Sequence, residues 1–127
     1  MNKVTLISTV FNEAASIKRF CDSILNQTDI PDEIVIVDGG SSDNTVELIK
    51  EAFSGLAGQC ELNVIVDPEC CKKYSKGPIA RGRNVAIRNA KYNHILVTDA
   101  GCIVDKDWVK NMKACFDEGA EIVSGTY

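Results

Sequence analysis

The stretch EIVIVDGGSSDNT, from Glu33 to Thr45, decides the fold of this chain. Its apolar run, residues 34–37, ends abruptly in Asp38, and two glycines, two serines and a second acid follow before a helical pattern begins. This pattern predicts a buried strand that brings one carboxylate to the carboxyl edge of a sheet, where open α/β folds bind ligands. A similar pattern recurs where residues 95–98 lead into Asp99. Two strand-end carboxylates in one chain predict a nucleotide or metal–phosphate site.

Strand and helix patterns alternate along the rest of the chain. Apolar runs predict strands at residues 4–10, 34–38, 62–66, 94–99 and 121–124. Apolar side chains at three- and four-residue spacing predict helices at residues 14–26, 80–90 and 106–116. Another helix is expected after Asn44, which would cap it with Glu47 as its capping-box partner. The alternation predicts an α/β fold, with a mainly parallel sheet flanked by helices on both faces.

Length and composition limit the possible functions. The 127 residues suffice for one domain with a hydrophobic core, and the last predicted strand begins so near the end that we expect a truncated part of a larger fold. The net charge of -4 argues against general nucleic-acid binding. No apolar run approaches the ~20 residues of a membrane span, and the first residues lack the apolar core of a secretory signal. We therefore expect a cytoplasmic protein whose six cysteines, none in a CxxC pair, are reduced.

Asp38 has two chemical interpretations. A carboxylate at a strand end can accept an imide N–H from a pyrimidine base, or a pair of N–H groups from guanine. Asp is also common before Gly-Gly as a turn or helix-capping acid, and the motif alone leaves both interpretations open. Gly39 and Gly40 favour a ligand, because backbone without side chains lets a flat molecule approach closely.

Basic residues and the second acid indicate phosphate chemistry. The run 81–84, Arg-Gly-Arg-Asn, opens the helix predicted after a long polar loop. A helix N-terminus with guanidinium groups suits a diphosphate, although a solvated basic face would have the same composition. Asp99 could hold Mg²⁺ together with two phosphate oxygens and water. His94, the only histidine, starts a strand with no visible partner, and we expect no catalytic role for it.

Four motifs, STVFNE, IVIVDGGSSDNT, GRN and ILVTDAGC, resemble in order and spacing the first half of the family 2 inverting glycosyltransferases, which have the GT-A fold. The resemblance covers essentially the whole chain. It implies a nucleotide site formed by Val10, Phe11, Glu13, Asp38, Gly40, Arg83 and Asp99. In that site Phe11 would flank the base with Glu13 beside it, and Asp38 would read the base. Arg83 would lie beside the diphosphate.

The chain departs from the family's Asp-x-Asp motif at TDAGC. Asp99 matches the first acid, but Gly101 stands where the second, usually metal-binding, acid would be. The resemblance therefore implies either Mg²⁺ or Mn²⁺ bound through Asp99, or contacts of Asp99 with ribose or sugar hydroxyls. Gly39 likewise stands where many relatives carry a second Asp.

The resemblance implies transfer of a sugar, with inversion, from a nucleotide diphosphate sugar to an acceptor hydroxyl. The family's general base comes from the second half of the domain, so we expect it beyond Tyr127 and expect residues 1–127 to be the donor-binding half. A non-catalytic nucleotide-binding or regulatory module is the alternative. The base, the sugar and the acceptor stay open. Cell-envelope polysaccharide synthesis near the inner face of the cytoplasmic membrane is the expected setting, and apolar surface exposed by truncation would allow a homodimer.

Overall fold

The structure is a computed structural model that describes residues 3–56, 58–70, 77–100 and 103–117. Its elements follow the order β1 (Val4–Val10), α1 (Ile17–Leu25), β2 (Glu33–Asp38), α2 (Thr45–Ala52), the 3-10 helix η1 (Ser54–Leu56), β3 (Glu61–Val66), α3 (Pro78–Asn89), β4 (His94–Val97) and α4 (Trp108–Asp117). Strands and helices alternate as the sequence predicts. The strand predicted at residues 121–124 lies outside the described residues.

The described strands form one parallel sheet in the order β3-β2-β1-β4. The inner strand β1 pairs with β2 in a register that sets Val10 opposite Asp38, and with β4 in a register that sets Ile7 opposite Val97. Because the strands run in one direction, their ends meet at a single border of the sheet, which we call the carboxyl edge. The opposite border, where the strands begin, is the amino edge. The predicted parallel α/β architecture is confirmed.

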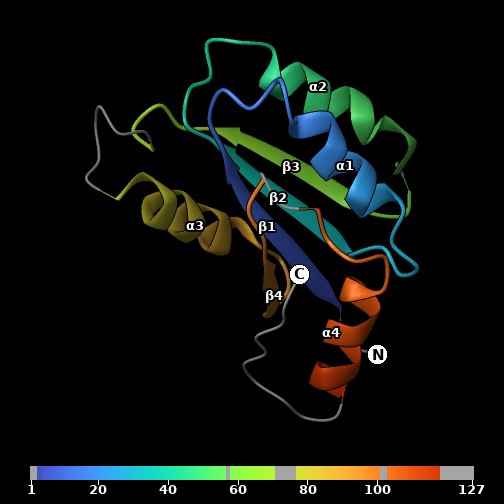
Figure 1. Ribbon diagram of the computed structural model, residues 1–127. Coiled ribbons are helices and arrows are strands. Elements are labelled where there is room, and N and C mark those ends of the chain that lie inside the picture. Colours follow the sequence, from blue (N-terminus) through green and yellow to red (C-terminus); the bar gives the residue numbers. More distant parts are fainter. Residues whose placement is uncertain (1–2, 57, 71–76, 101–102, 118–127) are drawn as a thin grey trace.

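Alternate strand residues face two separate cores. Figure 1 shows α1 and α2 on one face of the sheet and α3 on the other. The larger core joins Ile36 of β2 with Phe20 of α1 and Ile49 of α2, and it extends to Val109 of α4. The smaller core, on the opposite face, contains Ala86 of α3. Helices thus cover both faces and leave the carboxyl edge to the loops.

Two local predictions are wrong. Asn44 occupies the N-cap of α2 but makes no side-chain cap hydrogen bond, so the capping box with Glu47 does not form. Asp43 instead accepts a hydrogen bond from the backbone N–H of Thr45 at 3.1 Å, because its carboxylate lies directly over the first turn. The last described strand, β4, ends at Val97, so the acid that follows it stands in a loop rather than in the sheet.

Three of the described cysteines, Cys21, Cys60 and Cys70, pack in the cores as small apolar side chains. Those with free thiols are Cys21, Cys60, Cys70 and Cys115. Burial raises the pKa of Cys21 to about 12 and that of Cys60 to about 11, which keeps both thiols protonated and unreactive at neutral pH. Cys71 and Cys102 lie outside the described residues.

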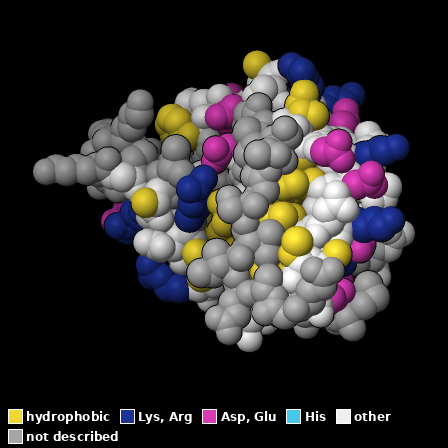
Figure 2. Space-filling view, turned by 60° about the horizontal axis from the view of Figure 1, so that its bottom comes forward, with side chains coloured by type: hydrophobic (Ala, Val, Ile, Leu, Met, Phe, Trp, Pro, Cys, Tyr) yellow, Lys and Arg dark blue, Asp and Glu magenta, His cyan; other side chains and the backbone are white. Residues whose placement is uncertain are grey.

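Some apolar surface stays exposed. On the face in Figure 2, hydrophobic side chains gather near the centre. Large hydrophobic residues that are about half exposed are Phe11, Val66, Ile87 and Ile103. Homodimerisation through apolar surface stays a prediction. Among the residues that the structure describes, none of the helices has the length and apolar character that a membrane span requires.

Candidate functional site

Both predicted acids stand at the carboxyl edge of the sheet, and Asp99 meets α3 there. Asp38 is the last residue of β2, and Asp99 follows β4 by two positions. Arg83 of α3 donates a hydrogen bond to Oδ1 of Asp99 at 2.9 Å. The helix can approach this closely because its neighbouring residue is Gly82, where a Cβ would lie 2.6 Å from Cγ2 of Thr9 on β1. A side chain at position 82 would push α3 away from β1, so Gly82 allows the close packing that places Arg83 beside Asp99.

Asp38 lies beneath the surface of this edge. Only 1% of the residue is exposed. Its Oδ2 accepts hydrogen bonds from the backbone N–H groups of Gly40 at 3.0 Å and Ser41 at 2.9 Å, and its Oδ1 accepts one from the Ser41 hydroxyl. These contacts match the turn-acid interpretation of the sequence. Direct contact between Asp38 and a base stays a prediction.

Neighbouring chain segments pack directly against the backbone of the two glycines after Asp38. A Cβ at Gly39 would lie 2.5 Å from the carbonyl oxygen of Cys70 and 3.3 Å from Cδ2 of Phe11. Gly40 has a φ of +89°, and a Cβ there would lie 3.3 Å from Pro68. The absence of side chains, which the sequence analysis attributed to a ligand, is therefore already required by the packing of three loops.

The residues predicted from the first loop differ in what they can offer a ligand. Val10 is 4% exposed and its side chain belongs to the larger core, so this position presents backbone only. Phe11 is 47% exposed, which leaves ring surface for stacking. Glu13 accepts a hydrogen bond from the Ser16 hydroxyl at 3.0 Å and donates its own N–H to Oγ1 of Thr45 at 2.9 Å. The loop is thus tied both to the start of α1 and to α2.

Asn12, which was not among the predicted site residues, joins the first loop to the turn after β2. Its φ is +51°, in the left-handed region that Asn tolerates better than most residues. Its N–H donates to Oγ of Ser41 at 2.8 Å, and its Oδ1 accepts the N–H of Ser42 at 2.8 Å. Oδ2 of Asp43 accepts the N–H of Ala14 at 3.2 Å. An Asn two positions after the end of β1 was the available signal, but the residues that it contacts lie about thirty positions away in the sequence.

The two arginines in the first half of α3 form ion pairs. Arg81 forms an ion pair with Glu69 at 2.6 Å, and Arg83 forms its pair with Asp99. The side chain of Arg83 is 39% exposed and that of Asp99 is 56% exposed, so both can meet a ligand from solvent. Arg88, in the last turn of α3, is exposed. The part of α3 that faces the carboxyl edge carries the charge that suits a diphosphate.

The metal prediction rests on Asp99. Within the described ranges, no group of three or more His, Cys, Asp and Glu side chains could hold a metal ion. Asp99 pairs with the guanidinium of Arg83. Gly101, which stands where the family's motif has its second acid, lies outside the described residues. Among the described residues, Asp99 would therefore need other ligands beside it, such as diphosphate oxygens and water, to hold a divalent cation.

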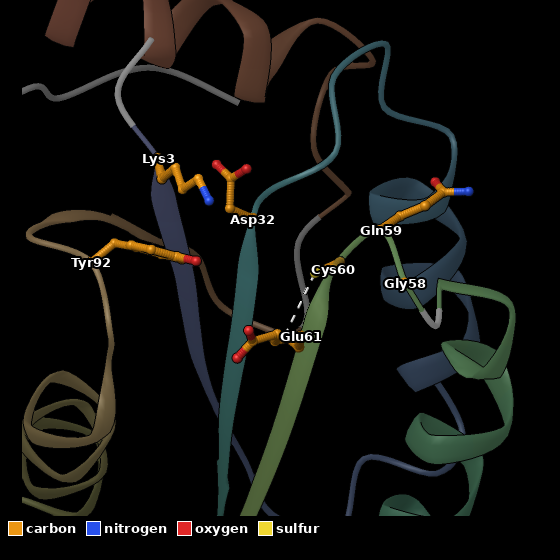
Figure 3. A pocket seen from close by; sticks show the side chains of 7 residues that line it. All are labelled: Lys3, Asp32, Gly58, Gln59, Cys60, Glu61 and Tyr92. Atoms are coloured by element: carbon orange, nitrogen blue, oxygen red, sulfur yellow. Dashed lines mark hydrogen bonds between the residues drawn. The ribbon is translucent and has the colours of Figure 1, made fainter.

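A hollow of about 260 Å³ lies at the amino edge, far along the strands from both acids. It is lined by Lys3, Asp32, Gly58, Gln59, Cys60, Glu61 and Tyr92. Figure 3 shows Lys3 and Asp32 close together at the starts of β1 and β2, with Tyr92 reaching in from the loop before β4. The Lys3 ammonium lies 5.6 Å from the centre of the Tyr92 ring, and the Cys60 thiol donates to the carbonyl oxygen of Glu61 at 3.6 Å. None of the predicted site residues lines this hollow.

His94 also lies at the amino edge, as the first residue of β4. Its ring centre is 4.6 Å from that of Phe116 on α4, with the two planes tilted by 45°. Aromatic contact of this kind serves packing. His94 is thus at the opposite end of the strand from Asp99.

The parallel sheet, its flanking helices and the polar loops of the carboxyl edge define an α/β fold of the GT-A type. The sequence model described as Glycosyl transferase family 2 matches residues 5–127. The chain belongs to this family.

Relatives share this region across only part of their length. Poly-beta-1,6-N-acetyl-D-glucosamine synthase of Staphylococcus aureus is 30% identical over 104 residues, which cover 82% of this chain and 23% of the relative. The crystal structure of S. aureus TarS matches with a TM-score of 0.73 and 27% identity, covering 91% of this chain and 20% of TarS. The mannosyltransferase PcManGT from Pyrobaculum calidifontis, in complex with GDP-Man and Mn²⁺, matches with a TM-score of 0.69 and 27% identity, covering 86% and 30%. This chain spans less than a third of each.

Proposed function

We propose that this chain binds the nucleotide diphosphate sugar of an inverting glycosyltransferase, and that the protein to which it belongs transfers the sugar to an acceptor hydroxyl. Membership of the family supports the class of reaction. The mannosyltransferase complex with GDP-Man and Mn²⁺ supports a nucleotide sugar as donor. The charges of the carboxyl edge supply the chemistry that such a donor requires.

The Arg83–Asp99 pair carries this proposal. A guanidinium is planar and always charged, and its fork of N–H groups matches the oxygens of a diphosphate. Arg83 is partly exposed, Gly82 lets its helix pack closely against β1, and Asp99 orients the guanidinium at the edge before the donor arrives. Because the nucleoside diphosphate leaves as an anion, a fixed cation beside it stabilises the transition state more than the ground state.

The first loop would hold the base. Phe11 offers an exposed ring on which a flat base can stack. Val10 would contribute backbone, and Glu13 would lie beside the base. The turn that carries Asp38 and Gly40 would form the floor of this part of the site.

A divalent cation would bind at Asp99 together with the diphosphate. Mg²⁺ or Mn²⁺ there would neutralise charge that develops on the leaving group. With a single carboxylate, the cation would depend on the nucleotide, since one acid holds a hydrated cation weakly and the diphosphate oxygens would supply the further ligands.

The reaction requires a general base, and we give that role to none of the site residues named above. The base takes the proton of the acceptor hydroxyl while the oxygen attacks the anomeric carbon, and the bond from that carbon to the diphosphate oxygen breaks on the opposite side. We assign residues 1–127 to donor binding and place the base in the remainder of the protein. The small share of each relative that this chain covers supports this division.

Calorimetry with UDP, GDP, TDP and CDP, each with and without Mn²⁺, tests the proposal. We expect one base to be preferred and Arg83→Met to weaken binding by about tenfold or more, because the variant cannot make a charge-assisted hydrogen bond to the diphosphate. Arg88→Met is the matched control, since Arg88 lies on the same helix away from the edge, and it should change the affinity less than about twofold. No binding by the unmodified chain, or equal effects of the two substitutions, would refute the assignment.

A non-catalytic nucleotide-binding module is the second candidate, favoured by the single acid at the metal position. Sugar transfer by the full-length protein separates the two, because such a module binds nucleotide without turnover. The name of the poly-N-acetylglucosamine synthase supports a polysaccharide product for our first candidate. We further propose that the protein acts in cell-envelope synthesis, in the cytoplasm near the inner face of the membrane.

A further inference from the structure

Asp99 is a single carboxylate that two cations would have to share. Its Oδ1 accepts a hydrogen bond from the guanidinium of Arg83 at 2.9 Å, and the two side chains form an ion pair. The proposed function places a divalent cation at the same acid. In the part of the chain that the structure describes, no group of three or more His, Cys, Asp and Glu side chains could hold a metal ion. These residues therefore offer the cation no ready set of protein ligands around Asp99.

The neighbouring arginine is engaged by a different acid. Arg81 lies two positions before Arg83 on α3, and its guanidinium pairs with Glu69 at 2.6 Å. Residues two positions apart on a helix do not face each other, which agrees with their separate partners. Of these two arginines, Arg83 is thus the one whose charge acts directly on Asp99.

The guanidinium and a divalent cation would oppose each other at this acid. A cation on either oxygen of Asp99 would lie next to the guanidinium of Arg83, and like charges at that distance repel each other. The two side chains are 56% and 39% exposed, so water and salt weaken the repulsion without removing it. To bind at full strength, the cation has to displace Arg83 from the carboxylate, and the loss of that ion pair reduces its net gain.

The altered motif places both demands on one side chain. Gly101 stands where the family's motif has its second acid. With two acids, one carboxylate could bind the cation while the other paired with the arginine. With Asp99 as the motif's one acid, whatever the cation gains there is taken from Arg83.

We propose that Arg83 limits how strongly a divalent cation supports donor binding, because the guanidinium and the cation compete for Asp99. This inference rests on the proposed function. As long as Arg83 is present, the donor site relies mainly on its own arginine, and Mn²⁺ adds little to the affinity. Removing the guanidinium leaves Asp99 to the cation and increases the contribution of Mn²⁺.

Calorimetry tests this inference through the gain in nucleoside diphosphate affinity that Mn²⁺ confers, which is the ratio of the dissociation constants without and with the cation. Binding of Mn²⁺ to free nucleotide enters every ratio equally and cancels between variants. The gain should rise by about fivefold in Arg83→Met, since the cation then meets no competitor at Asp99. It should change by less than about twofold in Arg83→Lys, which keeps the positive charge.

Arg88→Met is the matched control, because it removes a charge from the same helix away from the edge, and its gain should stay within about twofold of that of the unmodified chain. A double variant shows where the competition takes place. In Asp99→Asn the gain should vanish, and adding Arg83→Met should not restore it, because the neutral amide is a weak ligand for a hard cation. If Arg83→Met raises the gain equally with and without Asp99→Asn, the two cations do not compete at Asp99 and the inference is overturned.

The outcomes separate this inference from the proposed function. If the unmodified chain binds no nucleoside diphosphate, the proposed function fails and this inference falls with it. If it binds and the gain from Mn²⁺ is unchanged or smaller in Arg83→Met, the inference alone is overturned. An equal rise in Arg88→Met overturns it too, since the total charge would then be the cause. Thermal midpoints should match that of the unmodified chain, because an ion pair this exposed contributes little to stability, and a match excludes unfolding as the cause.

Discussion

The end of β2 and the end of β4 carry the same local pattern, an apolar strand followed by an acid, and yet the two acids lie in different surroundings. Asp38 is 1% exposed and accepts three hydrogen bonds from its own turn. The side chain of Asp99 is 56% exposed and faces one guanidinium. A strand thus brings an acid to the sheet edge, but the residues that follow the strand determine whether the acid is buried in its own turn or is exposed to a ligand.

The partners of the two acids explain the difference. After Asp38 the chain turns back sharply at Gly40, whose φ of +89° aims two successive N–H groups at the carboxylate. The carboxylate of Asp99 instead meets Arg83 from a different element. The first acid is satisfied by partners two and three residues away, and the second by a partner sixteen residues away.

The largest expected effect comes from removing the buried acid. Asp38→Ala leaves two backbone N–H groups and a hydroxyl without an acceptor, and we expect the free energy of unfolding to fall by about 3 kcal/mol. Asp38→Asn keeps one acceptor oxygen and should lose about half as much. Urea unfolding measures both. A loss under about 1 kcal/mol for the alanine variant would show that the turn forms without the carboxylate.

Sequence alone predicted the elements of this region because their causes are local. The buried run at residues 34–37 and the helices with apolar stripes follow from spacing within one element. The bond from Asn12 to Ser41 joins residues 29 positions apart, and the contact that excludes a side chain at Gly39 comes from Cys70. Such contacts depend on how loops meet in space, and no local pattern encodes them. The exposure of Asp38 was unpredictable for the same reason.

We expect an intermediate effect on stability at low pH, and it should come from Asp43, the other acidic residue of the turn after β2. Hydrogen bonding, chiefly from the Thr45 hydroxyl, lowers the pKa of Asp43. A lowered pKa in the folded state means that the charged form contributes stability above the unfolded value of about 3.9, and that this contribution is lost as the pH falls through the folded pKa. Asp43→Asn removes the titration.

Thermal midpoints at pH 6 and in a series below pH 4 test this. The unmodified chain should lose more stability across that range than Asp43→Asn does, since the other acids titrate in both. If the thermal midpoints of the two proteins fall in parallel as the pH is lowered, the charge of Asp43 does not contribute to the stability of the turn.

The smallest effect on stability is expected at Asp99, and it completes the comparison. An ion pair this exposed contributes little, so Asp99→Asn should change the free energy of unfolding by no more than about 0.5 kcal/mol. The same substitution should abolish any gain in nucleoside diphosphate affinity that Mn²⁺ confers, because the neutral amide is a weaker ligand for a hard cation. Urea unfolding and calorimetry with and without Mn²⁺ measure the two effects. If Asp99→Asn instead destabilises the chain as strongly as Asp38→Asn, both acids serve the fold, and the cation must find its protein ligand elsewhere.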